Sequence, residues 1–189
     1  MAKAKVLSER EQRLVMNAAK QSRHPERNVL MMMLGLSAGM RAIEIASIKV
    51  GDVLDENGEL NEQVYLDKEQ TKGRKSRVVY MNKRLRKAVV DYIQHAGIAN
   101  KRQLQLLRTQ SNSGFSADSI RQAMRGLFEQ AGISNASSHS CRRTALTTLA
   151  DKGVAVHIIR EIAGHQNLAT TQQYLAVSSD KLSGAVELL

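Results

Sequence analysis

The stretch VGDVLDENGELNEQVYLDKEQTKGRKSRVVYM, residues 50–81, decides the fold class, because the spacing of its hydrophobic residues differs from that of its surroundings. Short runs of β-favouring residues lie around Val53, at Val64–Leu66 and at Arg77–Met81, and the turn sequences DENG and KGRK separate them. This spacing predicts three antiparallel strands. Helical periodicity continues on both sides, so we expect a mainly α protein with a small antiparallel β-sheet, in the α+β class.

Helix signals flank this stretch in both directions. Toward the N-terminus, Ser8 and Glu11 form a capping-box pattern that begins one helix, and Pro25 suits the first turn of another. Toward the C-terminus, Asn82 caps a helix that Gly97 ends. The inward face of that helix carries Leu85, Val89, Tyr92 and Ile93. A further amphipathic helix in ADSIRQAMRGLFEQAG and short helices to the end of the chain complete the prediction.

Composition and charge indicate a polyanionic partner. The chain has 189 residues, 42% of them hydrophobic, which is enough for one domain with a buried core. Lys and Arg number 28 against 18 Asp and Glu, and the net charge of +10 favours nucleic acid over a merely soluble basic protein. Aromatic residues make up only 3%, which argues against a single-strand binder, because such proteins stack bases on aromatic rings.

The sequence also predicts a cytoplasmic protein without a membrane partner. Cys141 is the only cysteine and cannot form an internal disulfide, the N-terminus has no apolar signal segment, and the apolar run Val29–Met40 is too short to cross a bilayer. We expect Cys141 to be a small buried residue. The alternative is a reactive thiol, because the neighbouring Arg142 and Arg143 could lower its pKa.

Cations cluster around the predicted hairpin turn. Lys72, Arg74, Lys75 and Arg77 lie there with no acidic residue among them. The plain interpretation is a solvated face. A projecting tip with four cations suits a DNA groove or a phosphate better, so we expect DNA contacts at this tip.

Two further pairs of polar residues have the i, i+3 spacing that places side chains on one face of a helix. Arg41 and Glu44 lie in the apolar stretch GMRAIEIA, so Arg41 is expected to be partly buried and oriented by Glu44 toward an anion. His139 and Arg142 together suit the oxygens of a phosphate. Each pair taken alone is also compatible with an ordinary surface contact.

In combination and in this order, these motifs resemble the catalytic domain of the tyrosine recombinases, the phage integrase family. GMRAIEIASIKVGDV resembles the motif of the family's first arginine, TKGRKSRVVYM its hairpin lysine, HSCRRT its H-x-x-R box, and AGHQNLATTQQY its G-H box followed by the nucleophile. Cys141 stands where the H-x-x-R box usually has a leucine. The resemblance implies six catalytic residues, which are Arg41, Lys72, His139, Arg142, His165 and Tyr174.

The resemblance implies DNA strand breakage and rejoining through a covalent 3′-phosphotyrosine at Tyr174. That link conserves the energy of the phosphodiester, so neither ATP nor another cofactor is expected. Arg41 and Arg142 would hold the phosphate, and Lys72 would protonate the departing 5′-oxygen. His139 would assist proton transfer around Tyr174 or the phosphate, and His165 would hydrogen-bond the phosphate and position the nucleophile. No histidine or cysteine pair has metal-ligand spacing, so no metal is expected. The further candidates for DNA contact are Arg74, Lys75, Arg77 and Arg143.

The resemblance covers the chain from Ser8 onward and implies a single catalytic domain. We expect an N-terminal tail over 1–7, a catalytic core over 8–178 and a C-terminal helix over 179–189. That helix could pack on its own domain or dock on a neighbouring protomer. No separate core-binding domain is expected ahead of the catalytic one, and a natural short form and an excised fragment both remain open.

The implied partners are double-stranded DNA and further copies of the chain, as a homo-oligomer (a tetramer) on DNA, with room for accessory DNA-bending proteins. Two other functions are compatible with the same charge and fold. One is a DNA-binding regulator that has lost catalysis, and the other is strand relaxation of the type IB topoisomerase kind. The complete set of six candidate residues favours the recombinase over the first, and the short length and the spacing of the G-H box favour it over the second.

Overall fold

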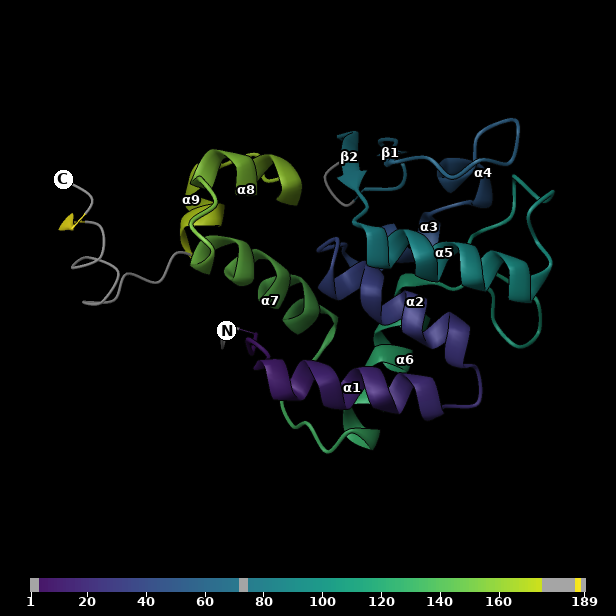
Figure 1. Ribbon diagram of the computed structural model, residues 1–189, viewed down its shortest axis with the longest axis horizontal. Coiled ribbons are helices and arrows are strands. Elements are labelled where there is room, and N and C mark those ends of the chain that lie inside the picture. The colour runs from purple at the N-terminus through teal and green to yellow at the C-terminus, as the bar shows by residue number, and fades with distance from the viewer. Residues whose placement is uncertain (1–3, 72–74, 175–185, 188–189) are drawn as a thin grey trace. The chain divides into compact units, whose positions relative to one another are not determined.

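The computed structural model describes residues 4–71, 75–174 and 186–187 (Figure 1). The chain divides into two compact units, residues 1–145 and 146–189. Within the described ranges, no helix has both the length and the apolar character needed to cross a bilayer.

The first unit consists of helices with one small sheet. Its elements in chain order are α1 (Glu9–Gln21), α2 (Pro25–Leu36), α3 (Ala42–Ser47), α4 (Val50–Val53), β1 (Gln63–Leu66), β2 (Arg77–Tyr80), α5 (Lys83–Ala96), α6 (Ala117–Gln130) and the start of α7 (Ser138–Asp151). Helix α2 lies between α1 and α5 and packs against both (Figure 1). The prediction of a mainly α protein with a small antiparallel sheet is therefore confirmed.

The helix ends follow the predicted signals. The Ser8 hydroxyl accepts the backbone N–H of Glu11 at 3.2 Å, and the Glu11 carboxylate accepts the backbone N–H of Ser8 at 2.9 Å, which completes the capping box of α1. Asn82 accepts the backbone N–H of Leu85 at 2.9 Å at the start of α5, and Gly97 ends that helix in the left-handed region with φ of 60°. The predicted inward residues of α5 are all buried.

The sheet is smaller than predicted. Among the described residues it has two strands, β1 and β2, which are antiparallel with Leu66 opposite Arg77. The segment around Val53 forms α4 instead of a third strand, because the Asp52 carboxylate accepts the backbone N–H of Lys49 at 2.8 Å and begins a helical turn. Val53 is still fully buried, so its apolar character was interpreted correctly and its backbone conformation was not.

Two features fix the first turns of α7 against the rest of the unit. The backbone N–H of Leu7, which was expected to lie in the N-terminal tail, donates to the Thr144 hydroxyl at 2.8 Å, and Leu7 is buried. A Cβ atom at Gly35 in α2 would lie 2.9 Å from the Cβ of Cys141, closer than such atoms approach. The absence of a side chain at Gly35 therefore allows α2 and α7 to meet.

The second unit contains the rest of α7 together with α8 (Val156–Ala163) and α9 (Leu168–Gln172). Its small core consists of Leu146, Ile159 and Ala163, and Tyr174 is among the residues that pack against it. Tyr174 lies in a turn just after α9. The helix predicted over 179–189 lies outside the described residues apart from 186–187.

The burial of Cys141 predicts an unreactive thiol. Burial raises the pKa of this thiol to about 12, so the thiolate that reacts with electrophiles is scarce near neutral pH, although two arginines follow it in the sequence. We expect a thiol-specific reagent such as DTNB to modify the folded protein at least about 100-fold more slowly than the urea-unfolded chain. Equal rates in the two states would contradict the burial of Cys141.

Candidate active site

The first arginine motif places Arg41 at the N-terminal cap of α3. Its backbone N–H donates to Oε2 of Glu44 at 2.8 Å, and its side-chain Nη1 donates to Oε1 of the same carboxylate at 2.9 Å. The Arg41 side chain is 27% exposed, whereas that of Glu44 is fully buried. Glu44 therefore orients Arg41, as the apolar surroundings predicted, and leaves part of the Arg41 side chain at the surface.

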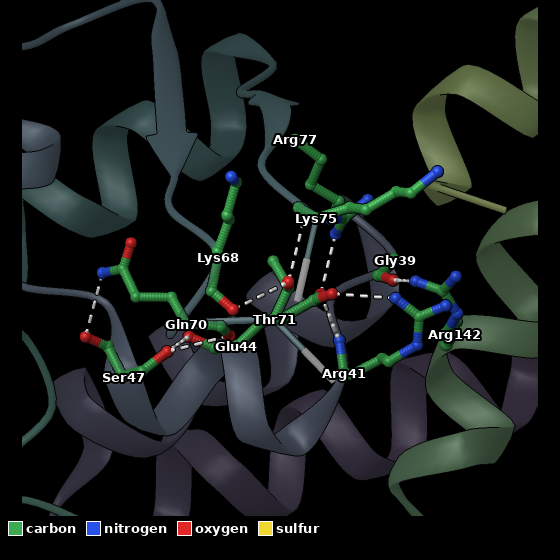
Figure 2. Close-up of polar contacts among 10 residues, drawn as sticks. All are labelled: Gly39, Arg41, Glu44, Ser47, Lys68, Gln70, Thr71, Lys75, Arg77 and Arg142. Atoms are coloured by element: carbon green, nitrogen blue, oxygen red, sulfur yellow. Dashed lines mark hydrogen bonds and ion pairs between the residues drawn. The ribbon is translucent and has the colours of Figure 1, made fainter. Parts of the chain in front are cut away.

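Glu44 also binds a second arginine, which the sequence assigned to a different role. Nη2 of Arg77 donates to Oε2 of Glu44 at 2.8 Å, and the Arg77 side chain is only 7% exposed (Figure 2). Side chains alternate along a strand, and in β2 the inward positions are those of Arg77 and Val79. The expectation that Arg77 projects from the hairpin toward solvent is therefore wrong.

The guanidinium of Arg77 keeps its charge in this buried position. Burial lowers the pKa of Arg77, and the adjacent Glu44 carboxylate raises it. An arginine has so high a starting pKa that it remains protonated under such conditions. Glu44 therefore pairs with two guanidinium groups at once, and its single negative charge is shared between them.

The start of α7 carries His139 and Arg142, one turn apart. His139 is exposed, whereas Arg142 is buried and its Nη1 donates to the carbonyl oxygen of Gly39, two residues before Arg41. Figure 2 shows Arg41 bonded to Glu44 and Arg142 bonded to Gly39, so both side chains are anchored at the start of α3. Two positive charges fixed by hydrogen bonds at the start of α3 form an arrangement that suits an anion with several oxygens.

The other predicted DNA contacts differ in their placement. Lys75 is exposed, and its backbone carbonyl accepts the Thr71 hydroxyl at 2.8 Å. Arg143 is partly buried, and its Nε has no hydrogen-bond partner among the described residues. Lys72 and Arg74 lie outside the described residues. Among the described cations of the hairpin, Lys75 is thus one whose exposed side chain can contact a partner.

The second unit brings together the two residues of the G-H box motif. Gly164 ends α8 in the left-handed region, with φ of 61°, and His165 follows it. The rings of His165 and Tyr174 are stacked, with centroids 5.8 Å apart and planes 11° from parallel. Nδ1 of His165 is hydrogen-bonded to the Thr171 hydroxyl at 2.9 Å. The imidazole is therefore held from one side by Thr171 and covered on one face by Tyr174.

Thr171 is a site residue that the sequence analysis did not find. It is fully buried, and its hydroxyl orients the imidazole through one ring nitrogen. A threonine between the histidine and the tyrosine is a weak signal by itself, because threonine hydroxyls often bond the backbone of their own helix.

Among the described residues, no group of three or more His, Cys, Asp or Glu side chains lies close enough to hold a metal ion.

Comparisons with known proteins identify the family of the chain. A family model described as the phage integrase family matches residues 5–181. The chain is 26% identical over 147 residues to a protein named tyrosine recombinase XerC of Leptospira interrogans, which covers 77% of this chain and 45% of that protein. It is 27% identical over 161 residues to tyrosine recombinase XerA of Pyrococcus horikoshii, with 85% and 54% covered. The chain thus spans about half the length of the curated relatives it matches.

Solved structures show the same fold. A crystal structure of XerA recombinase superposes with a TM-score of 0.78 at 23% identity, covering 100% of this chain and 64% of that one. The Tn1549 transposon integrase in complex with transposon right end DNA gives a TM-score of 0.79 at 17% identity, covering 98% and 66%. At such identities the likeness concerns the arrangement of the backbone.

The shared carboxylate predicts a large loss of stability on its removal. Glu44→Ala would leave one buried and one partly buried guanidinium without their anion, so we expect unfolding in urea to require about 3–5 kcal/mol less free energy. The matched control is Glu129→Ala, which breaks an exposed i, i+4 pair with Arg125 and should have little effect. A similar small effect of both substitutions would contradict the buried ion pairs.

Proposed function

The chain belongs to the phage integrase family, and on that premise we propose that it is the catalytic domain of a site-specific DNA recombinase, which cuts and rejoins DNA strands through a covalent phosphotyrosine at Tyr174. The observation that carries the proposal is the pair of guanidinium groups of Arg41 and Arg142, each fixed by hydrogen bonds at the start of α3. Such groups suit a scissile phosphate, because a guanidinium is always charged and donates two parallel hydrogen bonds to oxygens.

The two arginines would act on the non-bridging oxygens of the phosphate. Negative charge builds on these oxygens as the nucleophile attacks, and donors fixed beforehand stabilise that charge without reorganising. Arg41 is suited to this role because Glu44 holds it while part of its side chain stays exposed. Arg142 is suited to it because its backbone hydrogen bond fixes its direction.

Tyr174 would supply the nucleophile. Its oxygen forms a bond to phosphorus, the bond from phosphorus to the 5′-oxygen breaks, and the 5′-oxygen takes a proton from a general acid, for which we propose Lys72. A 5′-hydroxyl of another strand then attacks the phosphotyrosine and releases the tyrosine. A free phenol has a pKa near about 10, so neighbouring cations would be needed to favour the phenolate. His139 would assist these proton transfers, and His165 would hydrogen-bond the phosphate and position Tyr174.

The proposed partner is double-stranded DNA, bound by a homo-tetramer in the cytoplasm. Accessory DNA-bending proteins are compatible with this assembly. The net charge of +10 supports this partner, as does the DNA in the solved complex of the Tn1549 integrase. Lys75, Arg74 and Arg143 are the proposed additional DNA contacts. Arg77 is left out of this set because its buried guanidinium is bound to the carboxylate of Glu44. A catalytically inactive regulator or a topoisomerase-like enzyme is less favoured, since the relatives are named recombinases.

The proposed reaction can be tested without knowledge of the natural target. The protein is incubated with a library of random-sequence duplexes that each carry a nick, so that cleavage releases a short fragment and traps the covalent adduct. We expect denaturant-resistant protein–DNA adducts whose sequences converge on one site, and none with Tyr174→Phe, because that variant lacks the attacking oxygen. Recovery of no adduct from the wild-type protein, or of equal adducts from the variant, would refute the proposed enzyme.

The exposed position of Lys75 predicts a contribution to DNA binding through phosphate contact. Lys75→Ala should reduce the slope of log affinity against log salt concentration by about 1, because each neutralised phosphate releases condensed counterions. The matched control is Lys101→Ala, which removes the same charge from another exposed position. Equal slopes for the two variants would show that Lys75 makes no such contact.

A further inference from the structure

We propose that Arg77 is a positioning residue for Arg41: by compensating the charge of Glu44, it leaves the charge of Arg41 available to a phosphate. This inference rests on the proposed function, since the phosphate it concerns is the scissile one. Arg77 lies buried at the start of β2 with its guanidinium bound to Glu44, and through this carboxylate it acts on Arg41.

The two oxygens of the Glu44 carboxylate bind different partners. Oε1 accepts Nη1 of Arg41 at 2.9 Å. Oε2 accepts both the backbone N–H of Arg41 and Nη2 of Arg77, each at 2.8 Å. Arg77 therefore binds the oxygen that the Arg41 side chain does not use, and both arginines are accommodated at once (Figure 2).

Arg77 also changes the net charge of the cluster that it forms with Glu44 and Arg41. One carboxylate and two guanidinium groups carry a net charge of +1, whereas Glu44 with Arg41 alone would be neutral. The exposed fractions of the side chains are 0% for Glu44, 7% for Arg77 and 27% for Arg41, so the surplus charge is presented through Arg41. Because Arg77 is largely out of water, its field is weakly screened and acts on an anion bound nearby.

Hydrogen bonds to α3 anchor the hairpin whose strand β2 carries Arg77. The Ser47 hydroxyl at the end of α3 donates to the carbonyl of Gln70 at 3.3 Å, and the Gln70 amide donates to the carbonyl of Ser47 at 3.2 Å. Thr71 then donates to the carbonyl of Lys75, just before β2 begins. These contacts hold the described parts of the hairpin against α3, so Arg77 reaches Glu44 from a fixed position (Figure 2).

The test compares two substitutions that separate charge from hydrogen bonding. Arg77→Gln removes the charge and keeps an N–H donor for Glu44, whereas Arg77→Lys keeps the charge. Inorganic phosphate is titrated into protein labelled with ¹⁵N-arginine, and binding is followed at the Nε–H signal of Arg41, assigned with Arg41→Lys. We expect Arg77→Gln to weaken phosphate binding at Arg41 about tenfold and Arg77→Lys to change it less than about threefold.

Arg102→Met is the matched control for loss of a partly buried arginine, because Arg102 bonds the backbone carbonyl of Leu54 and does not contact Glu44. It should leave phosphate binding unchanged. If Arg77→Gln binds phosphate as the wild-type protein does, or if Arg77→Lys loses binding as severely as Arg77→Gln, the inference is overturned. Should Arg77→Gln fail to fold, Arg77→Met is used in its place with the same expectation.

A second measurement uses a duplex recovered from the nicked library and the single-turnover rate of adduct formation at saturating DNA. We expect Arg77→Gln to lower this rate about tenfold or more, and to lower it no further when Arg41 is already replaced by alanine, because Arg77 acts through Arg41. Additive losses would indicate a merely structural role and overturn the inference. If the wild-type protein forms no adduct, the proposed function fails while the phosphate titration still decides the role of Arg77.

Discussion

The buried carboxylate of Glu44 is the constraint on which the arrangement of the first unit's site depends. A charge without access to water must be compensated, and here the compensation comes from α3 and from β2, which are far apart in the sequence. The same carboxylate therefore decides where the sheet lies against the helix and in which direction Arg41 points. An arrangement of this kind couples the fold to the chemistry, because any shift of β2 changes the charge around the arginine.

Much of the fold could be predicted from local signals. The capping box at Ser8 and the cap at Asn82 specify helix ends through contacts within a few residues, and such contacts do not depend on the rest of the structure. Val53 was misassigned because a short apolar run satisfies both a strand and a helical turn. The choice between them was made by the Asp52 carboxylate, whose contact with the backbone of Lys49 is not visible in hydrophobic spacing.

The site was predictable where its chemistry is local and was missed where it is not. Arg41 and Glu44 lie one helical turn apart within an apolar segment, so their pairing follows from the sequence. The inward direction of Arg77 depends on the phase of β2, and a cationic cluster at a hairpin conceals that phase. Thr171 in α9 bonds His165 in the turn between α8 and α9, and no spacing rule connects two such positions.

The close approach at Gly35 limits how this chain can exchange parts with its relatives. A Cβ atom there would lie 2.9 Å from the Cβ of Cys141 and 3.1 Å from Cε of Met124, so α2, α6 and α7 pack closely around Gly35. A chimera that takes α7 from a relative with leucine at position 141 must find room for the larger side chain. Such exchanges should therefore succeed only when α2 and the first turns of α7 are transferred together from the same relative.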